Sequence, residues 1–446
     1  MNDHTVVAFP PPIPNPPPIP SPPRNPGPPP IPSLPDPGPT RARFTGSMPA
    51  YRRLMIRGAI LQVLTLGIYR FWLLTDMRRF EWANTEVGGE SAEYTGTAIE
   101  LLLGFLIAIA LLVPIFVMIA LAGLGLGVIG QFSGLLGYLL LAVLGQYAYF
   151  RARRYRLTRT VFRGVRLHQT GSAWGYAGRS VMWWIAITLT LGLAYPFAQA
   201  SLERYKLKAT FYGDLQGAFV GRAASLFWRG LAIWLIVVAP TALMCAVAAA
   251  RTDWSALVEA LNANDGSFEP DATLKTALGL ASSAFSWFMF WLVVLYPAFQ
   301  ALMLRWWLNG LRFGDVTVSS NLRTGQVYGA YLRYLGWSML ITFGAFVGFA
   351  MIAGIVWAVS KGSHAVVDKD TGGVIAAVGV VIAYVVVAFT LWIVYQVAVK
   401  LRLWRITVDS VEFHGFEAVE RVRADTSQPS SAVGEGLVDA LGASGM

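Results

Sequence analysis

Six segments of the sequence are apolar over a length that can cross a lipid bilayer, whose hydrocarbon core takes about 20 residues of helix. Only 13% of the 446 residues are charged, compared with about 25% in soluble domains. A chain of this composition must place much of its apolar surface in lipid. We therefore expect an all-α integral membrane protein with six full transmembrane helices, at Ile99–Ala122, Leu135–Phe150, Ala224–Ala250, Ala277–Leu304, Leu335–Val359 and Val374–Val399.

The six segments pair into three hairpins, whose internal loops are Gly123–Gly134, Arg251–Lys275 and Lys361–Gly373. The second of these loops is acidic, whereas the segments that connect one hairpin to the next are rich in arginine and lysine. Basic segments next to transmembrane helices stay in the cytoplasm. We expect the basic segments and both termini in the cytoplasm, and the acidic loop outside.

Two further apolar stretches, Leu54–Leu74 and Val181–Leu202, are each interrupted by the tripeptide Thr-Leu-Gly. If both stretches crossed the membrane, the basic segments on either side of the second would lie in opposite compartments, against the charge rule. We expect each stretch to enter the membrane and return, or to lie along the interface, packed against the six spans. The expected bends are at Thr65, Gly67, Thr190 and Gly192. The alternative is eight full spans.

The sequence repeats itself at fixed shifts. A shift of 125 residues places Thr65-Leu66-Gly67 on Thr190-Leu191-Gly192, and a shift of 101 places Tyr195-Pro196 on Tyr296-Pro297. Such self-similarity indicates a repeated supersecondary unit. Each copy continues from an arginine–aromatic helix end into short β-forming runs broken by glycine. We expect small repeated cytoplasmic β-units, and several copies side by side can pair into one small sheet.

More than half of the residues from Pro10 to Pro39 are proline. Proline fixes φ and lacks an N–H, so this stretch is expected to be an extended polyproline II arm. No apolar leader precedes it, so we expect the arm in the cytoplasm, as a spacer or as a ligand for a proline-recognising protein. The expected organisation is a disordered arm (1–40), a polytopic membrane domain with internal repeats (41–423) and a disordered C-terminal tail (424–446).

Several short motifs together match a known family pattern. They are Arg43-Phe44-x-Gly46, Thr65-Leu66-Gly67-Ile68-Tyr69-x-Phe71-Trp72, Arg78-Arg79-Phe80, Asn84-Thr85, Gly88-Gly89, Tyr94-x-Gly96 and Gly171-Ser172-Ala173-Trp174-Gly175-Tyr176. These motifs resemble the YjgN family of bacterial inner-membrane proteins, over about Arg41 to Arg423. The sequence departs from the pattern after Gly46, where Met48-Pro49-Ala50 replaces polar or acidic residues. The resemblance implies a multi-pass inner-membrane protein of unassigned function, and it transfers no catalytic residue.

The sequence carries little that points to catalysis. The single cysteine, Cys245, allows no intrachain disulfide, and the four histidines lack the spacing of metal ligands. His168 and Ser172 can be imagined as base and nucleophile, but no nucleophile-elbow motif surrounds the serine. No P-loop or dinucleotide fingerprint is present. We expect a non-enzymatic protein without a metal or cofactor, and no nucleic-acid partner, because the basic residues lie at the ends of apolar runs.

Two sets of polar residues are candidates for function. The first set is an arginine cluster that can contact anionic lipid headgroups or merely set the topology: Arg151, Arg153, Arg154, Arg156, Arg159, Arg163 and Arg166. The second set comprises glutamines near cytoplasmic helix ends, which can bond between helices or line a polar vestibule: Gln146, Gln199, Gln300 and Gln396. Glycine pairs such as Gly344 and Gly348 allow close helix packing within the chain or in a homo-oligomer.

Two functions remain open on these grounds. The first is organisation of lipids or partners through a basic cytoplasmic face and the proline-rich arm. The second is transport, or a channel, for a small uncharged or lipid-like solute, because broken helices often line transport sites.

The topology has a direct test. A cysteine introduced at Ser267 should react with a membrane-impermeant thiol reagent from outside the cell, and cysteines at Thr158, Lys208 and Ser319 should not. Reaction of Thr158 and Lys208 from opposite sides would contradict the assignment of Val181–Leu202 as a segment that enters and returns.

Overall fold

A computed structural model describes residues 38–125, 132–255, 257–258, 272–362 and 369–422. The chain divides into two units, Met1–Gly38 and Pro39–Met446, and the architecture below is that of the second unit. The proline-rich arm, the C-terminal tail and much of the three loops within the hairpins lie outside the described residues.

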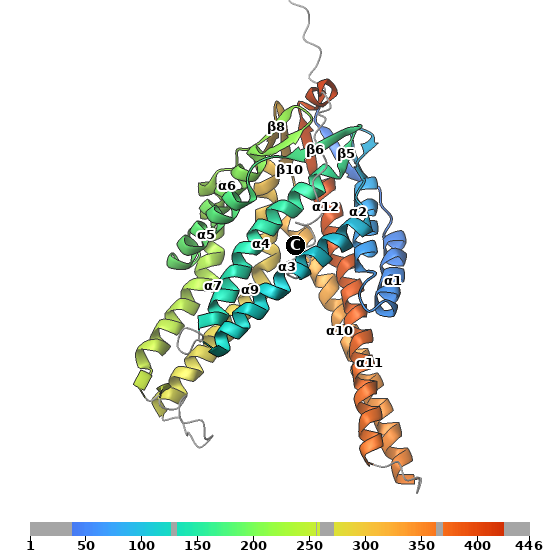
Figure 1. Ribbon diagram of the computed structural model, residues 1–446, viewed down its shortest axis with the longest axis vertical. Coiled ribbons are helices and arrows are strands. Elements are labelled where there is room, and N and C mark those ends of the chain that lie inside the picture. Colours follow the sequence, from blue (N-terminus) through green and yellow to red (C-terminus); the bar gives the residue numbers. More distant parts are fainter. Residues whose placement is uncertain (1–37, 126–131, 256, 259–271, 363–368, 423–446) are drawn as a thin grey trace, which may run out of the picture. The chain divides into compact units, whose positions relative to one another are not determined.

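Six of the described helices are long and apolar enough to cross a membrane, by length and composition. The six expected spans are confirmed in that sense, although most of the helices extend several residues further at the end that carries the strands (Figure 1). The helices are α3 (Ala98–Gly125), α4 (Ser133–Thr158), α7 (Ala223–Arg251), α9 (Ala272–Gly310), α10 (Thr324–Gly362) and α11 (Lys369–Tyr395), which continues through a π-helical segment, η2 (Gln396–Leu401), into α12 (Arg402–Asp409).

The expectation of an all-α protein was wrong, because eleven strands form one antiparallel sheet. The strands are β1 (Thr40–Phe44), β2 (Thr85–Val87), β3 (Glu90–Ser91), β4 (Glu93–Tyr94), β5 (Thr160–Phe162), β6 (Val165–Gln169), β7 (Thr210–Tyr212), β8 (Leu215–Phe219), β9 (Leu311–Phe313), β10 (Val316–Ser320) and β11 (Val411–His414). Their order in the sheet is β3-β2-β1-β11-β10-β9-β8-β7-β6-β5-β4.

The sheet closes on itself. Its two end strands, β3 and β4, are consecutive in the chain and are separated only by Ala92. One stretch of backbone therefore pairs with β2 through its first half and with β5 through its second half. The end strands of the sheet are thus joined through one stretch of backbone and have only two residues each, so the open edge is short, and a long open edge is a site of aggregation. Pairing of several β-units into one sheet agrees with the sequence-based expectation, whereas the inclusion of β1 and β11 and the return of the sheet onto the Glu90–Tyr94 backbone were not expected.

The ring explains the repeat in the sequence. Four helices of the described chain, α2, α4, α6 and α9, each run into a strand hairpin from which the next helix leaves. A fifth hairpin forms between the two ends of the domain, where β11 follows α12 and β1 precedes α1. Pairing of Thr40 with Phe413 and of Arg41 with Glu412 joins these ends. The domain is thus a cycle of five helix–hairpin–helix units.

A recurring arginine contact connects the two helices in four of the five units. In three of the units an arginine near the end of the incoming helix donates to a glycine carbonyl just before the outgoing helix, 17 residues later. In the fourth unit the acceptor is the hydroxyl of a threonine at the start of α10. The pairs are Arg79 with Gly96, Arg154 with Gly171, Arg204 with Gly221 and Arg305 with Thr324. These contacts are the structural reason for the repeated arginine–aromatic motif.

The Thr-Leu-Gly tripeptides form sharp turns between short helices. The first turn joins α1 (Met48–Leu64) to α2 (Arg70–Ala83), and the second joins α5 (Ala173–Leu189) to α6 (Tyr195–Lys208). In both turns the leucine and the glycine have positive φ, 50° and 93° in the first and 49° and 93° in the second. Neither stretch is therefore one continuous helix of spanning length, which argues against eight full spans.

The threonine of each tripeptide locks the turn. The Oγ1 of Thr65 donates to Leu61 O at 2.7 Å and accepts from Tyr69 N at 2.9 Å. Thr190 makes the matching bonds to Ala186 O and from Ala194 N, at 2.7 and 3.0 Å. Apolar side chains stand at the tips, where Leu66 is 94% exposed. Such tips favour insertion into lipid.

Candidate functional site

The arginine cluster lies largely against the protein itself. Arg159 forms an ion pair with Glu100 at 2.8 Å, and Arg163 lies 3.4 Å from Glu90. Arg153 and Arg154 donate to side-chain and backbone oxygens, respectively. Arg151 also has an interaction within the protein. The remaining two members differ, because Arg166 is exposed on β6 and Arg156 is partly buried on α4.

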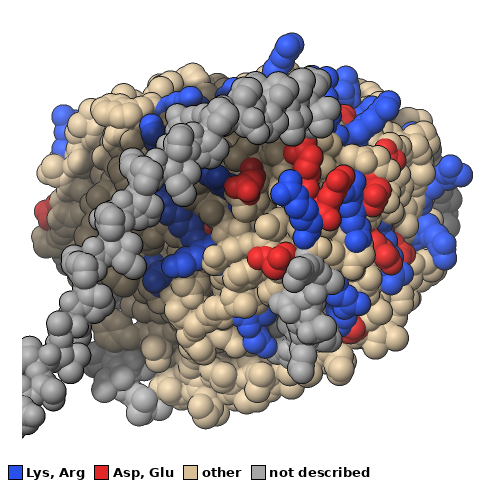
Figure 2. Space-filling view, turned by 90° about the horizontal axis from the view of Figure 1, so that it is seen from above, with Lys and Arg blue, Asp and Glu red and all other residues tan. Residues whose placement is uncertain are grey.

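The face of the molecule that carries the strands bears both signs of charge (Figure 2). Arg41 and Glu412 pair across β1 and β11 at 3.0 Å, and Arg163 contacts Glu90 and Glu420. The strand layer is therefore a mixed surface, and many of the arginines and lysines lie on the adjoining helix ends. Lys and Arg side chains also lie in a hollow of this face (Figure 2).

The four glutamines lie on four different elements. Gln300 accepts a hydrogen bond from the Tyr331 hydroxyl at 2.8 Å and so links α9 to α10. Gln396 is 6% exposed at the start of η2, and its Oε1 has no hydrogen-bond partner among the described residues. Gln146 and Gln199 are half-buried on α4 and α6. The structure gives one of the four an interhelical bond.

The structure gives His168 and Ser172 structural contacts, and it also shows the surroundings of the glycine pair on α10. Ser172 caps α5, because its Oγ accepts from Gly175 N at 3.2 Å, and His168 stacks on Phe211 at 5.0 Å. Close packing within the chain does not occur at Gly344 or Gly348, since a Cβ at either position would meet no atom of the described residues within 4 Å, and the alternative of packing in a homo-oligomer stays a prediction.

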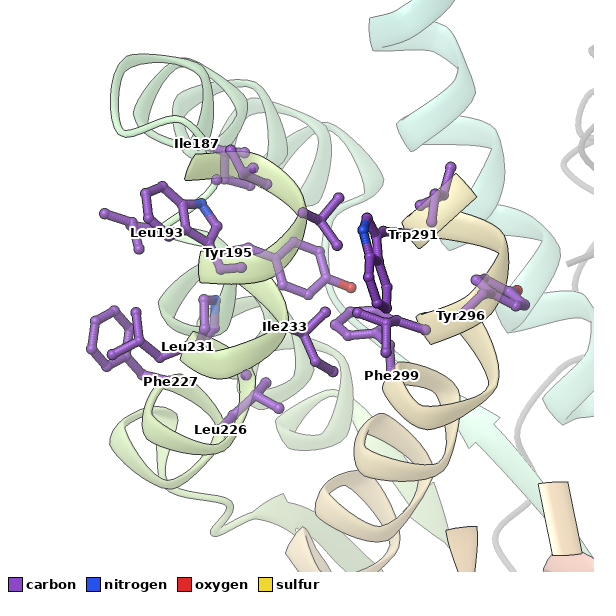
Figure 3. Close-up of a pocket in the computed structure, with 18 of the residues that line it drawn as sticks. Ile187, Leu193, Tyr195, Leu226, Phe227, Leu231, Ile233, Trp291, Tyr296 and Phe299 are labelled. Carbon is purple, nitrogen blue, oxygen red and sulfur yellow. The ribbon is translucent and has the colours of Figure 1, made fainter. Parts of the chain in front are cut away.

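A pocket that the sequence analysis missed lies between the second Thr-Leu-Gly turn, α7 and α9 (Figure 3). Its volume is about 370 Å³, within the range of about 300–1,000 Å³ that is usual for small-molecule sites. Its lining is almost entirely apolar and rich in aromatic rings, with Phe227 and Trp234 on α7 and Phe288, Trp291 and Phe299 on α9. Both helices are long and apolar enough to cross a membrane, so two candidate spans form walls of the pocket.

Indole hydrogen bonds position the walls of the pocket. Trp234 Nε1 donates to Leu191 O at 2.7 Å, which fastens the Thr-Leu-Gly turn to α7. Trp287 Nε1 donates to Ile236 O at 3.0 Å, which ties α9 to α7. Glycine leaves room in the wall, because a Cβ at Gly230 would meet no atom within 4 Å.

Two polar groups reach this apolar pocket. Trp291 Nε1 is buried and has no hydrogen-bond partner among the described residues. The hydroxyl of Tyr195 points toward the α9 side of the pocket, where Trp291 lies (Figure 3). Burial, followed by the nearby Glu203 carboxylate, raises the pKa of Tyr195 above its ordinary value. The phenol therefore stays protonated, and an indole N–H and a phenol O–H are present to bind an acceptor oxygen.

The residues that line this pocket follow a recognisable spacing in the sequence, but that spacing does not predict a cavity. The lining residues of α7 and α9 recur every three or four positions, the spacing of one helix face. Tyr195-Pro196 was noted only as the repeat of Tyr296-Pro297. A helix face of large apolar residues predicts contact with lipid or with another helix equally well, so the spacing does not distinguish a wall from a core.

Residues 39–440 match the model of a family described as bacterial protein of unknown function (DUF898). The chain belongs to this family. No curated protein and no solved structure shows a significant match to it. Family membership and the six apolar helices together indicate a bacterial membrane protein.

A second polar cluster of this DUF898 member lies between α2 and η2. Burial raises the pKa of the Glu81 carboxyl to about 7, against the smaller opposite effects of Arg78 and Lys400. The carboxyl is therefore protonated in the folded protein at mildly acidic pH, whereas it ionises near 4.5 when exposed. The folded protein therefore binds a proton at Glu81 that the unfolded chain has already released between about pH 4.5 and 7.

This proton makes stability depend on pH. The protonated Glu81 contributes to the free energy of unfolding. This contribution is fully present below about pH 4.5 and is lost as the pH rises through about 7. Glu81→Gln should therefore unfold at a higher temperature than the wild type at pH 8, by an amount equivalent to about 2 kcal/mol, and show little difference at pH 5. Thermal unfolding in a neutral detergent measures this. The exposed Glu93→Gln is the matched control, and an equal response from both variants would contradict the assignment.

Proposed function

We propose that this DUF898 protein is a lipid-binding protein of the bacterial inner membrane, which takes an acyl chain into the pocket between the second Thr-Leu-Gly turn, α7 and α9. The observation that carries the proposal is the lining, which is almost entirely apolar and aromatic and contains one buried indole N–H that has no partner among the described residues. Apolar walls suit a hydrocarbon chain, and a buried N–H favours an acceptor oxygen such as an ester carbonyl.

The orientation belongs to the same proposal. The strand ring and both termini lie in the cytoplasm, since the arginine-bearing helix ends meet at the ring. The two short helix pairs enter the inner leaflet from this side. The exposed leucines at their tips support this placement, because water is a poor environment for Leu66 and for Leu191, which are 94% and 57% exposed.

The role is non-enzymatic organisation of lipids and partners, as for a YjgN-type inner-membrane protein. The proline-rich arm is a docking segment for a cytoplasmic protein with an aromatic proline-binding groove. Lipids are the principal partners, and no cofactor is required.

One observation favours transport of a lipid-like solute as the second candidate. Gly192 and Leu193 of the Thr-Leu-Gly turn form part of the pocket wall, and a single indole bond from Trp234 fastens the turn to α7. Release of that bond would open the pocket sideways. The apolar lining suits a lipid-like solute and not a polar one.

Filling the pocket tests acyl-chain binding. Gly230→Phe places a ring in open space within the pocket, so it should fold and lower photo-crosslinking to a phospholipid with a diazirine in its acyl chain by about tenfold or more. Mass spectrometry of the wild type should locate the crosslinks on α7 and α9. Gly336→Phe on α10, whose added Cβ also meets no atom, is the control. Unchanged crosslinking in Gly230→Phe would refute the proposal.

The unpartnered indole gives a finer test. Trp291→Phe keeps an aromatic ring but removes the N–H, so binding of a diacyl phospholipid should weaken by about fivefold, the usual value of one hydrogen bond. Binding of the dialkyl-ether analogue, which lacks the ester carbonyl, should stay the same. Equal changes for both lipids would show that Trp291 contributes only packing.

A further inference from the structure

A cluster of charged residues lies where α4, α6 and α9 approach one another. The Nζ of Lys206 is 2.6 Å from Glu203 Oε1, and the Nε1 of Trp307 donates to the other carboxylate oxygen at 3.1 Å. Lys206 also donates to the Tyr149 hydroxyl at 3.4 Å and lies over that ring. Glu203 and Lys206 are 8% and 6% exposed, so this ion pair is almost removed from solvent.

Two arginines of α4 add positive charge to the same place. The two arginines lie three residues apart on one helix face, at Arg153 and Arg156. The charges of both interact with the Tyr149 hydroxyl, and the two guanidinium groups repel each other. Arg153 donates to Gln169 Oε1 and Thr210 Oγ1, at 2.7 and 2.8 Å. Both of these acceptors are neutral. Arg156 forms no ion pair within the described part of the chain.

The cluster therefore holds three cations, one carboxylate and the hydroxyl of Tyr149. The guanidinium groups cannot release their protons in a protein. Burial acts to lower the pKa of Lys206, but Tyr149 and Glu203 outweigh it and raise the pKa overall, so the lysine stays charged. Lys206 is buried and the two arginines are partly buried, and positive charge that is withdrawn from water without a counter-ion destabilises the fold. An anion would remove this cost.

We propose that Arg153, Arg156 and Lys206 form a binding site for a phosphate group, supplied by a lipid headgroup or by free phosphate. Arginine presents paired N–H donors that match phosphate oxygens, and lysine adds a point charge. The site is separate from the acyl-chain pocket. Glu203 lies eight residues after Tyr195 on α6, about 12 Å along the helix, and the proposal holds whether or not the pocket binds lipid.

The site also reinterprets the arginine cluster of the sequence. Of its seven members, Arg154, Arg159 and Arg163 contact the protein's own oxygens or carboxylates. Arg153 and Arg156 remain together, and the one carboxylate that acts on Arg153, that of Glu203, already forms an ion pair with Lys206. Phosphate recognition is thus assigned to an internal pair, next to the strand ring, rather than to the whole basic segment.

Thermal unfolding of the full-length protein tests the proposal. In a neutral detergent, millimolar inorganic phosphate should raise Tm by at least about 3 °C relative to sodium chloride of equal ionic strength. If the source is a headgroup, phosphatidylglycerol should raise Tm in place of free phosphate, and phosphatidylcholine, which is zwitterionic, should not. Arg156→Gln should abolish the shift, and Arg166→Gln, which removes an exposed arginine of the same segment, should retain it.

A second measurement guards against a variant that fails to fold. Equilibrium dialysis of radiolabelled phosphate, and mass spectrometry of retained phosphatidylglycerol, report directly on the wild-type protein. The proposal would be overturned if the wild type bound neither ligand and showed no rise in Tm. It would also be overturned if Arg156→Gln showed the same rise in Tm as the wild type. Loss of phosphate binding with intact acyl-chain crosslinking would separate this site from the pocket.

Discussion

Strands of two to five residues cannot form a stable sheet by themselves, because each offers few backbone hydrogen bonds and leaves its edge unpaired. In this protein five hairpins satisfy one another by pairing in a closed ring. The backbone at Glu90–Tyr94 pairs on both sides, and β1 with β11 joins the two ends of the domain. The ends of the helices are placed by this ring, so the arrangement of the bundle depends on it.

The ring treats its five units alike, but the helix pairs that connect them differ in length. Three connections are long hairpins of candidate spans, and two are short pairs that turn at Thr-Leu-Gly. A short pair cannot cover the full height of the long helices beside it. The second short pair ends against Trp234 of α7, and the pocket lies at this place. The difference between the two kinds of connection therefore produces the site.

Charge and apolar surface are separated along the helices. The apolar pocket begins at the first turn of α6, and the cluster of Arg153, Glu203 and Lys206 lies further along, toward the strands. This order matches a bilayer, in which hydrocarbon lies deep and phosphate lies near the aqueous phase. The two proposed sites would bind different parts of a membrane lipid, the acyl chain and the phosphate group. Each proposal is supported by a separate set of contacts.

The sequence by itself determined the six spans, the breaks at Thr65–Gly67 and Thr190–Gly192 and the presence of short β-forming runs, since apolar length and local turn residues are properties of neighbouring positions. Only the tertiary structure decided that these runs close into a ring, because β1 and β11 lie more than 360 residues apart and no local pattern records such pairing. The same holds for the sites. The sequence showed seven arginines within residues 151–166. Only the fold shows which of them form hydrogen bonds or ion pairs with other residues of the protein. The pocket arises from the distance between helices, which packing sets and residue spacing does not.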